Sequence, residues 1–214
     1  MIRRALSITA LGLVVSASAA RADSLLDLEL DYPLIVAQFG QLSYDADGAA
    51  SGNGLLTATA FTTSYDLDGF GTNPMYNMGT FNLSIEIIPS TGGLVYGSPD
   101  NHVLVTGDIT DDGTNNVVTL LESTKVKRFG YGTEDKFEVT FVLENGALHA
   151  PTAQMNIIMD ARHIPLFNDP IEPFFTQDFT STGLKADIFV PTPAAAWVAL
   201  PALAWVVIRS RKRC

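Results

Sequence analysis

The chain has 214 residues, 47% of them hydrophobic and 17% charged, with 23 acidic against 13 basic side chains. This acidic excess argues against nucleic acid as a partner, because every phosphate contact would form against the overall field of the protein. The one cysteine, Cys214, leaves no disulfide to form within the chain, and no Cys–His pattern for a structural zinc site is present.

The first 22 residues have the pattern of a signal peptide. Met1-Ile2-Arg3-Arg4 is a basic start, residues 5–15 are apolar, and Ala20-Arg21-Ala22 is an Ala-x-Ala cleavage site before Asp23. An uncleaved anchor is the alternative, but eleven apolar residues are too few to span a bilayer comfortably. We therefore expect an N-terminal signal helix over 1–22, cleavage by a signal peptidase, and export of the rest.

The expected mature body, 23–189, is strongly acidic. It contains all 23 acidic residues and six basic ones, a net charge of −17. Three of the basic residues lie together in Lys125-Val126-Lys127-Arg128, which we interpret as a solvated strand face; a site for a polysaccharide anion is the alternative. Outside the cell, such a charge suits solubility and the uptake of divalent cations.

Period-two alternation of apolar and polar residues dominates the body, as in a half-buried strand. Residues 81–87 alternate without a break, and 136–143 repeat the pattern with Lys136, Glu138 and Thr140 expected to face outward. Residues 117–129 and 136–143 are predicted to form a long hairpin. The other expected strands are 34–39, 41–44, 55–64, 103–109, 154–159 and 184–189.

About nine short strands separated by Gly, Asn and Asp turns predict an all-β fold. We expect one domain over 23–189, an antiparallel β-sandwich of jelly-roll-like type, because no helical period appears before the tail and no repeat of fixed length is present. The segment 166–178 contains three prolines and the pair Phe174-Phe175, so it is predicted to be a loop pinned to the sandwich by its aromatic side chains.

Two turns of the Asp-x-Asp-Gly type provide the one specific ligand signal. Asp45-Ala46-Asp47-Gly48 and Asp66-Leu67-Asp68-Gly69 each place two carboxylates one residue apart, and Ca²⁺ prefers such oxygen ligands. A third oxygen-rich turn lies at 108–115. The remaining ligands of an EF-hand are missing, and Asp-Gly is also an ordinary turn dipeptide. Calcium at Asp45, Asp47, Asp66 and Asp68 is the metal hypothesis, and no other cofactor is expected.

Signals for an enzyme are weak. The three histidines lie apart, and the sequence has no Gly-x-Ser-x-Gly, His-Glu-x-x-His or phosphate-loop motif, so no catalytic residue is predicted. Tyr65, Phe70 and Tyr76 are candidates for a sugar-stacking platform, with ordinary packing as the alternative. We expect a non-enzymatic protein; the alternative is an exported carbohydrate-active enzyme, which would need two carboxylates at catalytic separation on a concave sheet face.

The last segment, 190–214, has the composition of a membrane-held tail. Val190-Pro191-Thr192-Pro193 precedes an apolar run over 194–208, and Arg209-Ser210-Arg211-Lys212-Arg213 follows it. As a helix the run covers roughly 22 Å of an apolar slab about 30 Å thick, a short span that interfacial side chains extend. The basic end predicts that the C-terminus stays in the cytoplasm. A buried C-terminal helix of the domain is the alternative.

Val190-Pro191-Thr192-Pro193-Ala194-Ala195-Ala196-Trp197 with its apolar run and basic end resembles the PEP-CTERM sorting signal of Gram-negative bacteria, in the variant Val-Pro-x-Pro-Ala-Ala-x-Trp. Thr192 stands where the name-giving motif has Glu, and Ala-Leu-Pro-Ala-Leu-Ala replaces the usual Gly-Leu repeats. The resemblance implies recognition by an exosortase, a membrane transpeptidase that cuts near the Pro motif. The sorting residues would be Val190, Pro191, Thr192, Pro193, Arg209, Arg211, Lys212 and Arg213.

Substrates of this sorting system are typically surface or matrix proteins linked to exopolysaccharide and biofilm. The resemblance therefore implies an exported protein, held first in the inner membrane by its C-terminal helix and then placed at the cell surface or outside the cell. There the body would act by binding polysaccharide, a cation or neighbouring copies of itself.

Overall fold

The computed structural model describes residues 26–29, 31–110, 116–132, 136–149, 153–161 and 174–190. The predicted signal peptide and the sorting residues after Val190 lie outside these ranges. The described residues are all-β, as predicted, with one short 3₁₀ turn, η1 (Phe174–Thr176), and no α-helix. The strands are β1 (Leu34–Asp45), β2 (Gly54–Asp66), β3 (Asn73–Ile88), β4 (Gly93–Leu94), β5 (His102–Gly107), β6 (Val118–Ser123), β7 (Lys125–Tyr131), β8 (Lys136–Val142), β9 (Gln154–Ala161) and β10 (Phe179–Phe189).

The strands pair mainly with their neighbours in the chain. The order in the sheet is β6-β5-β3-β2-β1-β10-β9-β8-β7, with β4 beside β3, and every pairing is antiparallel. This meander corrects the expected jelly-roll-like connectivity, which needs long connections between strands that are not consecutive. Alternation predicts strands and their buried faces, whereas strand order depends on contacts that alternation does not encode.

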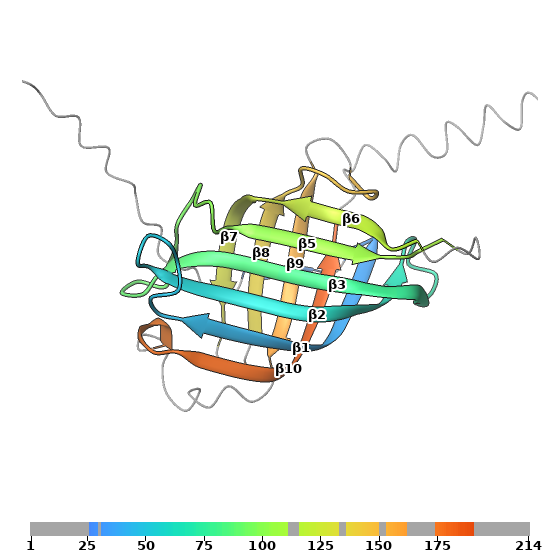
Figure 1. The fold of residues 1–214 in the computed structure, drawn as a ribbon. Coiled ribbons are helices and arrows are strands. Elements are labelled where there is room, and N and C mark those ends of the chain that lie inside the picture. The colour runs from blue at the N-terminus through green and yellow to red at the C-terminus, as the bar shows by residue number, and fades with distance from the viewer. Residues whose placement is uncertain are drawn as a thin grey trace, which may run out of the picture.

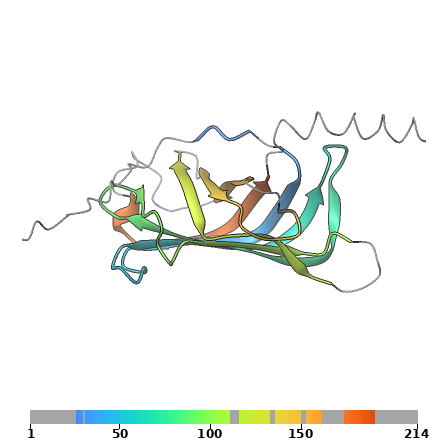
Figure 2. The ribbon, with the colours of Figure 1, turned by 90° about the horizontal axis from the view of Figure 1, so that it is seen from above.

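The sheet bends over to form two layers. Figure 1 shows β2, β3, β5 and β6 running across the front, while β7, β8 and β9 cross them steeply behind. The first and last strands, β1 and β10, are bent and contribute to both layers (Figure 1). Figure 2, seen from above, shows the long strands of the first layer along one side of the body and the strands of the second layer crossing obliquely on the other. The core fills the space between these layers.

The apolar side chains that the alternation assigns to the core are buried in the structure. Phe81, Leu83, Ile85 and Ile87 of β3 are all buried, as are the apolar residues of β8. On the outer side of β8, however, Glu138 and Thr140 are also buried, which corrects the expectation that they face solvent. Alternation assigns a side chain to one face of the sheet but does not show whether that face is covered.

A bulge in β1 creates the bend that carries this strand from one layer to the other. The pairing of β1 with both β2 and β10 shifts register around Phe39 and Gly40. A Cβ atom at Gly40 would overlap the carbonyl oxygen of Thr59, so only glycine fits there. The expected strands 34–39 and 41–44 are therefore two halves of one bent strand.

The chain passes between the layers a second time at Thr124. Residues 117–129, expected as one strand, form β6 in the first layer and β7 in the second. The segment after β8 then pairs with the outer edge of β6, where the backbone N–H of Glu122 donates to the carbonyl of Asn145 (3.0 Å) and that of Leu148 to Leu120 (3.0 Å). This pairing covers an edge that would otherwise present free backbone groups.

One aromatic residue of the predicted pinned loop fills the core, as expected for its described part. Phe175 is buried, and its ring lies 5.1 Å from that of Tyr44 and 5.0 Å from that of Tyr131. The Tyr44 hydroxyl donates to the Phe175 carbonyl oxygen (2.8 Å). The rest of that loop, up to residue 173, lies outside the described residues.

Candidate functional site

On the outer face of the first layer, the part formed by β10, β1, β2 and β3 carries rows of uncharged polar side chains. The strand register aligns Thr182, Gln41, Thr59 and Asn82 across β10, β1, β2 and β3. A parallel row two residues further along β1 contains Thr180, Ser43, Thr57 and Ser84. These rows differ from the rest of a body with a net charge of −17, because their side chains donate and accept hydrogen bonds but carry no charge.

A shallow groove of about 580 Å³ crosses this face at the bend of β1. Two phenylalanines stand beside it with much of their side chains in solvent: Phe39 is 77% exposed and Phe61 is 52% exposed. The other lining residues are Gly40, Gln41, Thr59, Ala60, Thr80, Asn82, Thr182 and Gly183, and none of these described residues carries a charge. The groove therefore combines exposed aromatic rings with neutral hydrogen-bonding groups.

The backbone at Phe39 adopts a conformation that bulky residues rarely take. Its φ angle is +58°, in the left-handed region, where a Cβ atom crowds the following carbonyl and costs about 1–2 kcal/mol. The strain is not offset by burial, because the ring is exposed. A side chain held outward at such a cost is typical of a binding surface, where strained conformations are concentrated.

Several polar groups of the groove have no protein partner among the described residues. No hydrogen bond engages the side chains of Gln41, Thr59 or Thr182, whereas the Asn82 amide donates to the Thr80 hydroxyl (3.0 Å). The Thr80 hydroxyl in turn lies 3.3 Å from that of Thr106. The groove thus presents free donors and acceptors beside a network that holds Asn82 in place.

A second groove of about 530 Å³ continues the same face along β1 toward its end. Its lining includes Ser43 and Thr57, whose hydroxyls are 2.8 Å apart. Asp45 and Asp178 also line it and make its end acidic. Beneath it, burial and the nearby Asp178, Asp45 and Asp47 raise the pKa of Tyr44 to about 12. The polar face therefore changes from neutral at Phe39 to acidic at Asp45, six residues or about 20 Å along the strand.

The structure separates the four aspartates proposed as calcium ligands. Asp45 pairs with Leu55 at one end of the β1–β2 ladder, and Asp66 pairs with Leu34 at the other. The eleven residue steps along β2 from Leu55 to Asp66 span about 36 Å, so the two motifs cannot share an ion. Among the described residues, no three His, Cys, Asp or Glu side chains are grouped to hold a metal.

Each motif instead closes its own turn. A carboxylate oxygen of Asp45 accepts the backbone N–H of Asp47 (3.1 Å). One of Asp66 accepts those of Asp68 (3.2 Å) and Gly69 (2.8 Å). These are the local bonds that make Asp frequent in turns. Calcium binding at either motif stays a prediction, and the residues 111–115 of the third turn lie outside the described ranges.

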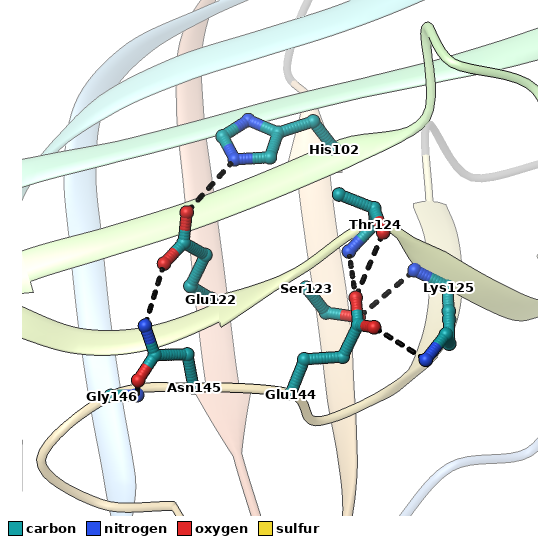
Figure 3. Close-up of polar contacts among 8 residues, drawn as sticks. All are labelled: His102, Glu122, Ser123, Thr124, Lys125, Glu144, Asn145 and Gly146. Carbon is teal, nitrogen blue, oxygen red and sulfur yellow. Dashed lines mark hydrogen bonds and ion pairs between the residues drawn. The ribbon is translucent and has the colours of Figure 1, made fainter.

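A polar cluster holds the corner between β6 and β7 (Figure 3). Glu144 accepts hydrogen bonds from the Thr124 backbone N–H (2.7 Å) and hydroxyl (2.8 Å) and pairs with the Lys125 ammonium (2.6 Å). The ammonium of Lys125 and then the N–H of Thr124 lower the pKa of Glu144 to about 2. Lys125, one of the basic residues singled out in the sequence, thus stabilises this corner.

Two further carboxylates secure loops. Glu86 is buried and accepts from the Asn53 amide (2.6 Å) and the Ser51 hydroxyl; burial alone would raise its pKa, but these hydrogen bonds lower it. Asp108 accepts from the Asn77 amide (2.9 Å) and the Thr110 N–H (3.0 Å), which lower its pKa to about 2. Both carboxylates therefore hold the strand ends in place.

The two phenylalanines of the groove were not among the aromatic residues predicted to stack on sugars. Of the predicted residues Tyr65, Phe70 and Tyr76, Tyr65 is buried with its hydroxyl donating to the Ile109 carbonyl (3.3 Å), and Phe70 lies on the loop after β2. The signal for Phe61 was present, because alternation in β2 places it on the same face as Thr57 and Thr59. The exposure of Phe39 depends on the bulge, which alternation does not show.

Of the sorting residues, only Val190 is described. It is buried, and its N–H donates to the carbonyl of Pro33 (3.3 Å), so the first residue of the Pro motif packs with the body. Within the described ranges, no helix has the length and apolar character required to cross a membrane. Comparison of the chain with protein-family models, with curated proteins and with solved structures gives no match.

Proposed function

We propose that this protein is an exported, non-enzymatic protein of the cell surface or extracellular matrix, sorted through its C-terminal segment, whose β-sandwich body binds polysaccharide. The signal-peptide pattern at 1–22 and the Pro motif with its apolar run and basic end support the export and the sorting by an exosortase-type transpeptidase. The groove between Phe39 and Phe61 carries the binding function.

The chemistry of the groove matches an uncharged polysaccharide. The face of a sugar ring carries C–H groups that pack on aromatic rings, and its hydroxyls need neutral donors and acceptors of the kind that Gln41 and Thr59 offer. The uncharged lining and the net charge of −17 disfavour polymers of uronic acids, because like charges repel. Strands aligned along one face also suit an extended polymer.

A binding titration with neutral and acidic polymers tests the proposal. The full-length chain in detergent micelles is titrated with laminarin and dextran, which are neutral, and with alginate, a polyuronate. We expect binding to at least one neutral polymer and none to alginate. Replacing Phe61 by Ala should raise Kd about thirtyfold, corresponding to about 2 kcal/mol for loss of a central aromatic contact.

Phe39→Asn separates binding from stability. Asn tolerates the left-handed conformation better than Phe, so the variant should be at least as stable as the parent while its Kd rises as for Phe61→Ala. Phe70→Ala, which removes a still more exposed ring outside the groove, is the control and should bind normally. The proposal is contradicted if both groove variants still bind like the parent. It is also contradicted if the parent binds neither laminarin nor dextran.

Incubation with the same neutral polymers also tests the alternative of a carbohydrate-active enzyme. The specific observation in its favour is the pair of carboxylates, Asp45 and Asp178, at the acidic end of the polar face. Release of reducing ends from laminarin or dextran, abolished in Asp178→Asn, would support hydrolysis. Unchanged polymer length after prolonged incubation supports binding alone.

A further inference from the structure

A second exposed apolar cluster lies far from the groove, at the end of the body where the chain leaves it. Phe70 is 93% exposed, and Leu67 and Tyr32 are also exposed. Phe70 and Leu67 belong to the loop that joins β2 to β3, and Tyr32 precedes β1. We call these three residues the exit cluster.

A backbone hydrogen bond connects Val190 to the exit cluster through Pro33. The N–H of Val190 donates to the carbonyl of Pro33, the residue after Tyr32. Gly69, with φ at +82°, lies so close to Tyr32 that a Cβ atom there would be 3.0 Å from the ring atom Cε2. Phe70 follows Gly69 immediately. The exit cluster therefore lies at the end of the sheet from which the Pro motif and the apolar run continue.

The length of the connecting segment limits how far this end can lie from a membrane. Only residues 191–193 separate Val190 from the apolar run that begins at Ala194. Four Cα–Cα steps of about 3.8 Å extend at most about 15 Å. If the run enters a bilayer, the exit cluster must lie close to the bilayer surface, because it lies at the same end of the body as the start of the tether.

We propose that Tyr32, Leu67 and Phe70 dock onto the phospholipid bilayer that holds the C-terminal segment, and so orient the body before sorting. Aromatic side chains are favoured at the boundary between headgroups and hydrocarbon. Asp31 and Asp68 lie beside the cluster, so the surface fits zwitterionic lipid better than anionic lipid. The groove at Phe39 stays free on the outer face of the first layer.

Site-directed labelling of the full-length chain tests this docking. In a Cys214→Ser background, Phe70→Cys receives a polarity-sensitive thiol-reactive fluorophore, and Tyr96→Cys, at an exposed residue elsewhere, is the matched control. Both proteins are reconstituted into phosphatidylcholine vesicles with and without lipids that carry a nitroxide near the headgroup. Co-flotation with the vesicles reports insertion of the tail independently of docking.

We expect at least twofold stronger quenching and a blue-shifted emission for the label at position 70 than for the label at 96. Substituting Tyr32 and Leu67 by Ser in the Phe70→Cys protein should reduce that quenching to the level of the control. Equal quenching at the two positions in protein that floats with the vesicles overturns the docking. Protein that does not float overturns tail insertion and docking together, while leaving the polysaccharide titration unaffected.

Discussion

Glu144 provides a sharp test of how the two layers are joined. It lies just after β8 and reaches the corner where the chain passes from β6 to β7, accepting two hydrogen bonds from Thr124 and pairing with Lys125. We predict that Glu144→Gln, which keeps the size of the side chain but removes its charge, destabilises the protein at neutral pH and much less in acid.

The expected magnitude follows from the pKa of Glu144, which the Lys125 ammonium and the Thr124 N–H lower from 4.5 to about 2. Taken in full, this displacement corresponds to about 3 kcal/mol of unfolding free energy. The carboxylate is 29% exposed and Lys125 is 66% exposed, so solvent screening reduces the expected cost to about 1–2 kcal/mol. For a chain of this size, that loss lowers Tm by about 3–6 °C.

The sign of the pH dependence is set by the lower pKa in the folded protein. The contribution of Glu144 is complete above about pH 4.5, the pKa of the unfolded chain, and is lost as the pH falls toward 2. Urea unfolding of parent and variant at pH 7 and at pH 2.5 should therefore give a difference that shrinks by about half or more in acid. Glu122→Gln, at the other glutamate drawn in Figure 3, is the control and should cost less than about 0.5 kcal/mol, because its contacts with His102 (3.7 Å) and the Asn145 amide (3.2 Å) lie at the surface. An equal penalty for Glu144→Gln at both pH values would refute the electrostatic reasoning.

Three further changes examine the core, the bend and the calcium hypothesis. Phe175→Ala should cost about 3–5 kcal/mol in urea unfolding, because it removes a buried ring that packs on Tyr44; a loss below about 1 kcal/mol would mean that the ring does not fill the core. Gly40→Ala should lower Tm and weaken polysaccharide binding together, since the new methyl group meets the backbone of Thr59; an unchanged Tm would contradict the bulge. Calcium at Asp66 and Asp68 predicts a Tm that rises with millimolar CaCl₂ and falls again with chelator, and an unchanged Tm in both would end that hypothesis.

The fold could be predicted to the level of its strands but not of their arrangement. The residues of β3 and β8 that alternation assigned to the core are buried. The strand order could not be predicted from the sequence, because a meander and a jelly-roll can share the same alternation and turn residues. The division of 117–129 at Thr124 was also missed, since a bend between layers leaves the apolar and polar pattern of each half intact.

The candidate site depended still more on tertiary structure. The aspartate pairs were visible in the sequence, but the antiparallel pairing of β1 with β2 places them at opposite ends of a ladder. Phe61 belonged to an outward-facing set that could be read from alternation. Phe39 did not, because its exposure results from the register shift at Gly40, which depends on the packing of three strands.

The amino-acid order by itself determined that this chain alternates in period two over its body, that its middle is strongly acidic, and that its ends have the composition of export and membrane segments. These are properties of neighbouring residues, so they can be read locally. Only the tertiary structure decided which polar rows become one continuous face, which phenylalanines stand beside its groove, and that the loop with Phe70 begins at the same end of the sheet as Val190. Those relations join residues far apart in the chain, and they are set by sheet register and by the bend between the layers.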